Sequence, residues 1–288
     1  MQLHSYWDNG IMYAPIEIKG GFVMNEIMNQ QSQLVVKHND LIQKSKYNLT
    51  ITQQKLIAYI ISLIKPTDKE LKKYEVSVSD FCQLCGIDKR YFYTDFKDLI
   101  DDLDNKAFWI ETDEKIFKFR WFLKAEYMKK QGKVLLLLDD DVKKYLIDLK
   151  EKFTVYELYN ILALKSKYSV RLYELFKSYA FQKEKVFLID EFKELLLATN
   201  YNNFKDFRNR VLEKAIDEIN FYTDLDVSYE TITKGRKVIA VKIYIKKKEM
   251  AENLQAYRNT IAEINKRNNQ ISGQISMFDK YIEVLKDE

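Results

Sequence analysis

The chain of 288 residues is 47% hydrophobic, which is enough for one large domain or two ordinary ones and excludes a wholly disordered protein. Only 7 glycines and 2 prolines stand against 20 tyrosines and 17 phenylalanines, which excludes a glycine-rich nucleotide fold and predicts a helix-rich α+β protein. The net charge is +4, and the segment from Glu249 onward carries 7 acids and 5 bases, so the positive charge lies before it.

The hydrophobic runs are short. The longest, at residues 56–64 and 134–138, are far below the roughly 20 residues that a membrane-spanning helix needs. The N-terminal residues have neither a basic start nor an uninterrupted apolar stretch, so they do not form a secretion signal. We therefore expect a cytoplasmic protein with no membrane partner.

The first half of the chain has the pattern of a winged helix. Helical periodicity predicts a helix over residues 50–64, which Pro66 ends. The elements predicted next are a strand at 74–78, helices at 79–85 and 90–104 separated by Gly86, and strands at 106–112, 116–127 and 133–138. Two helices around a turn, followed by a hairpin, indicate a winged helix.

The pattern then returns. The second set comprises a helix at 154–179, a strand at 186–188, helices at 190–197 and 204–221, and strands at 225–230 and 237–246. Phe81 matches Phe192 and Phe96 matches Phe207, with 111 residues between the members of each pair, which predicts an internal duplication. We expect a flexible extension at 1–33, tandem winged-helix domains at 34–150 and 151–248, and a polar tail at 249–288.

No motif for catalysis, metal binding or a cofactor is found. Gly132-Lys133 lacks the rest of a P-loop, and two histidines in the whole chain do not provide the closely spaced pair that a tyrosine nickase needs. Cys82 and Cys85 form a C-x-x-C pair, which can be a redox pair or half of a zinc site. Phe81, Leu84 and Cys85 fall on one face of a short predicted helix, where buried thiols are common, so we expect the pair to belong to the core. We expect no enzyme, although the aspartates at 101–102 and 139–141 leave a metal-dependent nuclease as an alternative.

The helix at 204–221 predicts contact with DNA. Its apolar residues fall on one face, and the opposite face presents Lys205, Asn209 and Arg210, which suit phosphates and base edges in a major groove. Arg208 falls toward the packed side of a helical wheel and ranks lower, although its long stem can reach solvent.

The hairpin after this helix holds the strongest charge signal. The stretch KGRKVIAVKIYIKKK, residues 234–248, has seven basic residues and no acid, and Gly235 places a tight turn at its tip. Such a stretch can be a solvated hairpin, but its position after a helix-turn-helix predicts a wing in which Lys234, Arg236 and Lys237 contact the DNA backbone.

The helix at the matching position of the first unit differs in charge. It presents Asp98, Asp101 and Asp102 outward, which repel phosphates. Its start, Lys89 and Arg90, together with Lys97, suits auxiliary backbone contact. We expect the first domain to contribute to self-association more than to base recognition.

Several stretches together resemble the iteron-binding plasmid replication initiators of the RepA, RepE and Pi type. They are LVVKHNDLIQ, FKFRWFLKAEYMKKQGKVLLLLDDDV, KFTVYELYNILALKSKYSVRLYELFKSY and NFKDFRNRVLEKAIDEIN, and the likeness covers residues 34–248. The resemblance implies two winged-helix domains that bind repeats in double-stranded origin DNA. It also implies monomers that help to open the origin and recruit host replication proteins, in equilibrium with homodimers that repress the initiator's own promoter.

The segment QISMF, with Gln274, Ile275, Ser276, Met277 and Phe278, lies in the polar tail. It resembles the short peptides with which bacterial replication proteins bind the sliding clamp, in which a few apolar anchors provide most of the affinity. The alternative is that its apolar residues pack on the protein itself. For the whole chain, the alternative to an initiator is a winged-helix repressor with no function at an origin.

Overall fold

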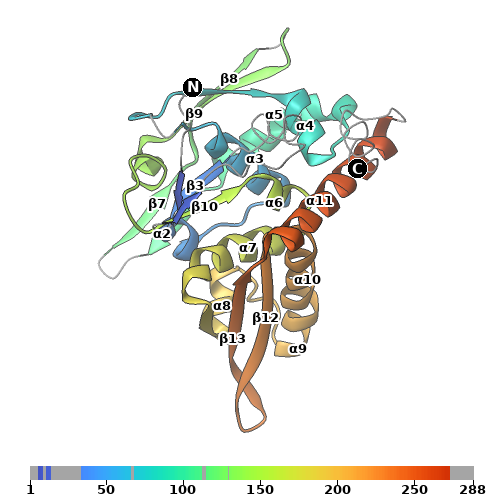
Figure 1. The fold of residues 1–288 in the computed structure, drawn as a ribbon. Coiled ribbons are helices and arrows are strands. Elements are labelled where there is room, and N and C mark those ends of the chain that lie inside the picture. The colour runs from blue at the N-terminus through green and yellow to red at the C-terminus, as the bar shows by residue number, and fades with distance from the viewer. Residues whose placement is uncertain are drawn as a thin grey trace.

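The structure is a computed structural model that describes residues 6–8, 11–13, 34–65, 68–111, 115–128 and 130–272. It confirms an α+β protein with two winged-helix units, one above the other in Figure 1. In the N-terminal extension, β1 (Tyr6–Asp8) pairs antiparallel with β2 (Ile11–Tyr13).

The first unit follows the predicted order. Its helices are α3 (Ile51–Ser62), α4 (Val78–Cys85) and α5 (Lys89–Asn105), and its strands are β5 (Lys73–Ser77), β8 (Phe122–Met128) and β9 (Lys133–Leu138). The strands form an antiparallel sheet in the order β5–β9–β8. Thr50 caps α3 in a capping box with Gln53, as the helix start predicted. Ser77 accepts the capping bond of α4, so this helix begins one residue before the predicted start at residue 79.

The second unit repeats this arrangement. Its elements are α7 (Lys167–Tyr179), η2 (Ala180–Gln182), β11 (Glu184–Leu188), α8 (Ile189–Leu195), α9 (Phe204–Phe207), η3 (Arg208–Leu212), α10 (Glu213–Tyr222), β12 (Leu225–Lys234) and β13 (Lys237–Lys247). The sheet order is β11–β13–β12, the counterpart of the first sheet. Phe81 and Phe96 form a T-shaped ring pair with centroids 6.0 Å apart, and Phe192 and Phe207 form one at 5.8 Å. The predicted duplication is confirmed.

A hairpin in the first unit has no counterpart in the second. Strands β6 (Phe108–Glu111) and β7 (Ile116–Phe119) join β4 (Ser45–Lys46) in a separate sheet. The single strand predicted over 116–127 is therefore wrong, because β7 pairs with β6 whereas β8 pairs with β9. Trp121 lies at the break, buried and stacked on Phe108 at 4.5 Å, and this packing holds the chain where it changes sheets.

The long helix predicted over 154–179 begins too early. Strand β10 (Phe153–Glu157) pairs antiparallel with β3 (Leu34–His38), and α6 (Tyr159–Leu162) separates it from α7. The aromatic and β-branched stretch FTVYE alternates between buried and partly buried positions, as a half-buried strand does. Two short elements adjoin these strands in the chain. The helix α2 (Asn39–Gln43) follows β3, and η1 (Asp140–Tyr145) lies between β9 and β10. The β3–β10 pairing joins a strand that precedes residue 150 to a strand that follows it. The division into domains at 34–150 and 151–248 stays a prediction.

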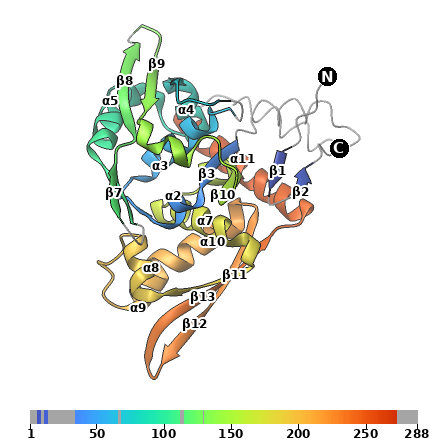
Figure 2. The same cartoon turned by 90° about the vertical axis from the view of Figure 1, so that its left-hand side faces the viewer.

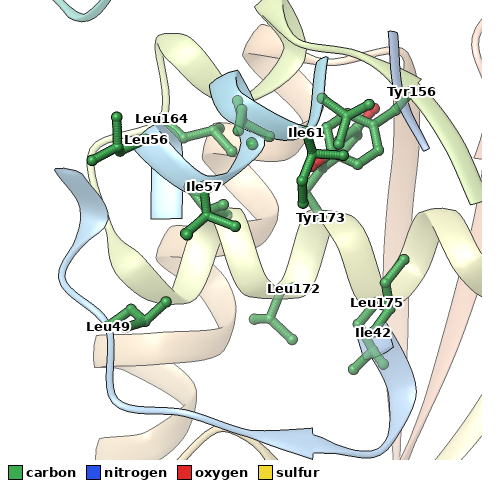
Figure 3. Packing of buried hydrophobic residues seen from close by; sticks show 14 of the residues in the cluster. Ile42, Leu49, Leu56, Ile57, Ile61, Tyr156, Leu164, Leu172, Tyr173 and Leu175 are labelled. Carbon is green, nitrogen blue, oxygen red and sulfur yellow. The ribbon is translucent and has the colours of Figure 1, made fainter. Parts of the chain in front are cut away.

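The hydrophobic core is continuous across the two units. Figure 3 shows Ile57 and Ile61 of α3 pointing toward α7, the helix that carries Leu172 and Leu175. All four side chains are buried, and each contributes about 1.5–3 kcal/mol through the apolar surface that it removes from water. The unit boundary is therefore not a hinge between two separate cores.

A buried ionic cluster lies beside this core. Lys37 of β3 donates to Glu174 of α7 at 2.5 Å, and the Tyr156 hydroxyl of β10 donates to the same carboxylate. Arg171 donates to the Ser45 carbonyl at 2.7 Å. Burial raises the pKa of Glu174, but Lys37 and the hydrogen bonds outweigh burial, so the pKa lies below its ordinary value. The cluster joins β3, β10 and α7 into one body.

The segment expected to be a polar tail begins as a helix, α11 (Met250–Ser272), which packs on both units. Thr260 donates to the Tyr222 carbonyl of α10, Arg267 donates to the Ala163 carbonyl at 2.6 Å, and Asn268 donates to the Gln83 carbonyl of α4 at 2.9 Å. In Figure 1, α11 runs diagonally from the second unit to α4. The polar composition of this segment did not indicate a helix, because only a few of its residues are buried and these pack against both winged-helix units.

Gly86→Ala tests the contact between α11 and α4. Gly86 has φ 64°, and an added Cβ would lie 2.5 Å from the Arg267 Cβ. We expect a loss of about 2 kcal/mol in the free energy of unfolding, from backbone strain and displacement of α11. Gly235→Ala is the matched control, because its φ is 62° and no atom lies within 4 Å. If both variants lose the same free energy of unfolding in a urea titration, the contact between Gly86 and α11 contributes nothing beyond backbone strain.

Lys55 on α3 is buried, with its ammonium donating to the carbonyls of Leu162 at 2.6 Å and Leu164 at 2.8 Å. Burial lowers its pKa to about 8. Between pH 8 and 10.5 the unfolded chain binds more protons at this residue than the folded chain, so this lysine makes stability rise with pH.

We expect wild type to gain on the order of 2–3 kcal/mol relative to Lys55→Met over this pH window. The comparison is a pair of urea titrations at each pH, and it cancels the effects of other groups that titrate there. A stability difference that stays constant with pH would contradict the lowered pKa.

Candidate nucleic-acid interface

The second unit presents its polar helix face as predicted. Asn203 caps α9 by accepting from the Asp206 amide at 2.8 Å, which fixes the helix start. Phe207 and Val211 are buried against the unit, whereas Lys205, Asn209 and Arg210 are exposed. Within the described part of the chain, Lys205 and Arg210 form no hydrogen bond or ion pair with another side chain, so both are available for a ligand.

The helix departs from regular geometry at Arg208, where the π-helical turn η3 begins. The Arg208 residue is partly buried and its side chain is 40% exposed, as expected for a long stem that reaches solvent from near the packed side. Its Nε donates to the Asn209 Oδ1 at 3.1 Å and lies 3.5 Å from a Glu213 carboxylate oxygen. A helical wheel with 3.6 residues per turn misplaces residues in such a turn, and these contacts direct Arg208 along the helix surface.

The β12–β13 hairpin projects beyond the body of the protein at the bottom of Figure 1. All residues from Thr231 to Lys237 are exposed, and Gly235 has φ 62°, which suits the turn. Among the described residues, the side chains of Lys234, Arg236 and Lys237 have no hydrogen-bond or ion-pair partner. The tip therefore presents three uncompensated positive charges.

Two contacts that sequence reasoning missed connect the helix to the hairpin. Asn220 of α10 exchanges two hydrogen bonds with the Val227 backbone of β12, at 2.7 and 2.8 Å. The Tyr229 hydroxyl donates to Glu213 at 3.2 Å. They hold the basic helix start and the hairpin in one arrangement, and nothing in the sequence pattern distinguishes them from other surface polar residues.

The first unit places acids where the second places bases. Asp98 and Asp101 of α5 are exposed, and Lys97 lies 3.8 Å from Asp101, which offsets its charge. A hydrogen bond from Lys106 lowers the pKa of Asp102 below its ordinary range. Lys89 and Arg90 lie in the first turn of α5, and their side chains are outside the described part of the structure.

Both helix-turn-helix elements lie toward the same side of the molecule. In Figure 2, α5 and α9 lie toward the left, and the β8–β9 and β12–β13 hairpins lie at the top and bottom of that side. The structure therefore brings together the predicted residues of α9, η3 and the second hairpin. It places those of α5 in a separate, mostly acidic part of the same side.

Other predicted features have structural roles. Cys82 and Cys85 are both buried in α4, and burial raises the pKa of the Cys85 thiol to about 11, which confirms their position in the core. Asp139 caps η1 by accepting from the Asp141 amide. Among the described residues, no group of three His, Cys, Asp or Glu side chains is placed to hold a metal ion. None of the described helices has the length and apolar character that crossing a membrane requires.

The fold and the charged face define a tandem winged-helix protein. The family model described as "Initiator Replication protein, WH1" matches residues 34–177, and "Initiator Rep protein, WH2" matches residues 188–245. The chain belongs to this family of plasmid replication initiator proteins.

Individual relatives agree with this family. A replication initiation protein from Escherichia coli is 28% identical over 67% of this chain and 64% of its own length. The PI protein of the same organism is 36% identical over 34% of this chain and 37% of its own length. The chain thus matches less than two thirds of either relative. The crystal structure of the Pi initiator protein in complex with iteron DNA has a TM-score of 0.63 at 22% identity, covering 76% of this chain and 99% of that one, and shows the shared fold.

Proposed function

We propose that this protein initiates plasmid replication by binding direct repeats in double-stranded DNA at an origin, without catalysing a covalent step. The observation that carries the proposal is the set of unpaired basic side chains on α9, η3 and the β12–β13 hairpin, in a chain of the initiator family. Lys205, Asn209 and Arg210 enter a major groove, and Lys234, Arg236 and Lys237 contact the adjacent backbone.

The two units have different roles in this proposal. The second unit provides sequence recognition, whereas the first, with the acidic α5, provides self-association and backbone contacts from Lys89, Arg90 and Lys97. Arg208 acts indirectly, since it positions Asn209. Monomers bound to several repeats open the origin and recruit host replication proteins, and homodimers in equilibrium with them repress the protein's own promoter.

We further propose that Gln274–Phe278 binds the host sliding clamp. This segment lies outside the described residues, so the proposal depends on its sequence. The described chain supports it in one respect, because α11 ends beside α4, away from the basic β12–β13 hairpin, so a bound partner would leave that hairpin accessible to DNA. Phe278→Ala should abolish capture of the purified clamp and leave DNA binding unchanged. Retained capture would contradict the proposal.

A second candidate is a repressor without origin function. The acidic face of α5 favours it, because a chain with one strongly basic unit can bind an inverted repeat as a dimer with one half-site per protomer.

Footprinting on DNA around the protein's own coding region separates the two functions. Protection of several evenly spaced direct repeats supports the initiator, and a plasmid with those repeats should then replicate only when the protein is present. Protection of a single inverted repeat, with no replication, supports the repressor. No footprint from a folded protein would overturn both.

A further inference from the structure

A series of polar side chains connects the hairpin strand β12 to the exposed face of the helix. The Tyr229 hydroxyl donates to the Glu213 carboxylate at 3.2 Å, and the same carboxylate oxygen lies 3.5 Å from the Arg208 Nε. The Arg208 Nε donates in turn to the Asn209 Oδ1 at 3.1 Å. Burial and the neighbouring Glu213 carboxylate raise the pKa of Tyr229 above its ordinary value, so this hydroxyl stays protonated and donates. The hairpin and Asn209 are therefore in polar contact through Glu213 and Arg208.

The π-helical turn η3 brings Arg208 and Glu213 together. The Glu213 backbone amide donates to the Arg208 carbonyl, five residues back. In a regular α-helix, residues five apart point to different faces, whereas the wider π-helical turn places them one above the other. Phe207 and Val211 stay buried on the inner side of this turn. The irregular geometry thus changes the outer face of the helix, and π-helical turns frequently occur at functional sites.

The amide of Asn209 has one of its two ends in use. A bidentate contact with adenine needs both the amide oxygen and the amide NH₂ group, because adenine presents an acceptor at N7 and a donor at N6. Here the oxygen accepts from the Arg208 guanidinium, whose positive charge repels a second donor such as the adenine amino group. The Nδ2 group has no partner within the described part of the chain. Arg208 and Asn209 together therefore present hydrogen-bond donors.

Guanine is the base that such a donor surface fits. Its major-groove edge carries acceptors at N7 and O6, whereas adenine and cytosine carry an amino donor and thymine carries a methyl group beside its acceptor. We propose that Tyr229, Glu213 and Arg208 are positioning residues that fix the Asn209 amide, and that Asn209 thereby selects guanine over adenine in the repeat. This inference rests on the proposed function, because it assigns one base contact within it. It makes the preference for a base depend on a strand outside the helix that contacts that base.

The test uses the duplex repeat located by footprinting, together with repeats in which each base pair is replaced in turn. Competition binding measures the preference for guanine over adenine at every position. Asn209→Ala should remove the preference at one position, which identifies the base that Asn209 contacts. We expect wild type to prefer guanine there by about tenfold, the size of one good base contact. Arg208→Met should reduce that preference at least about fivefold, and Arg208→Lys, which can still donate to Oδ1, should retain more of it.

Tyr229→Phe removes the hydroxyl that donates to Glu213 and should reduce the same preference by about twofold, since it acts through intervening side chains. The matched control is Lys214→Met. It removes one positive charge, as Arg208→Met does, from an exposed neighbour of Glu213 whose side chain has no polar partner among the described residues, and it should keep the preference.

Two results would overturn the inference alone. One is a wild type that binds its repeat but prefers adenine at the position identified by Asn209→Ala, and the other is an equal preference in wild type and Arg208→Met. A folded wild type that does not distinguish its repeat from unrelated duplexes would overturn the proposed function as well, so the two failures are distinguishable.

Discussion

Replacing Arg210, Lys234 and Arg236 with alanine is expected to weaken binding to the protein's own duplex repeats by roughly 100- to 10,000-fold, since each contact is worth about 1–2 kcal/mol. All three side chains are exposed, and none has a hydrogen-bond or ion-pair partner within the described residues. The substitutions therefore remove charge from the proposed DNA-binding surface without disturbing the fold, and the thermal unfolding temperature should be unchanged.

The salt dependence of binding provides a second readout. Each phosphate contact that is lost reduces the slope of log K against log salt by about 0.9. A base contact from Arg210 would change sequence preference instead, so Arg210→Ala alone should reduce discrimination between the repeat and a variant repeat. The measurement is fluorescence anisotropy at several salt concentrations.

The control variant carries Lys150→Ala, Arg258→Ala and Lys266→Ala, three exposed positions outside the proposed interface. It has the same net charge as the test variant, so it should retain most of the affinity. A similar loss in both would show that binding depends on overall charge rather than on η3 and the hairpin, and would refute the assigned interface.

Glu174→Gln is expected to destabilise the folded protein by about 3 kcal/mol, because it leaves the Lys37 ammonium buried without a counter-charge. Glutamine retains an acceptor for the Tyr156 hydroxyl, so the loss reports mainly on charge. The measurement is the free energy of unfolding in urea.

The double variant Lys37→Met with Glu174→Gln removes both charges and should recover much of the loss. A double variant no more stable than the single one would contradict this explanation.

The stabilisation from Glu174 depends on pH with a defined sign. Its pKa is lower in the folded protein than the ordinary 4.5, so the contribution is complete above the unfolded value and is lost as pH falls through the folded value. The difference in stability between wild type and Glu174→Gln should therefore shrink on acidification. A constant difference would mean that the carboxylate is not the origin of the effect.

The sequence predicted correctly those helices whose starts, ends and buried faces are determined by residues near one another in the chain. Thr50 begins a helix, Gly86 ends one, and a single apolar face over residues 204–221 specifies the helix that carries Arg210. The matched phenylalanines predicted the duplication because a repeated core needs the same ring at the same place. The basic candidates could be chosen in advance, since surface charge is visible in the sequence.

Other features depend on partners that are distant in the sequence. Residues 153–157 form a strand because residues 34–38 lie beside them, and helical spacing downstream obscured that pairing. α11 is a helix with two packing partners, and its polar surface resembles a solvated tail. The π-helical turn at Arg208 changes side-chain directions that a regular wheel assumes.

The ring pairs Phe81–Phe96 and Phe192–Phe207 have a consequence for how the two copies could diverge. In each copy the second ring belongs to the inward side of the helix whose outward side meets solvent. Requirements for folding and for recognition therefore act on opposite sides of one helix, and either can change without the other. After duplication, one copy could exchange bases for acids while both kept the same interior, and a single ancestral module could supply two specialised surfaces.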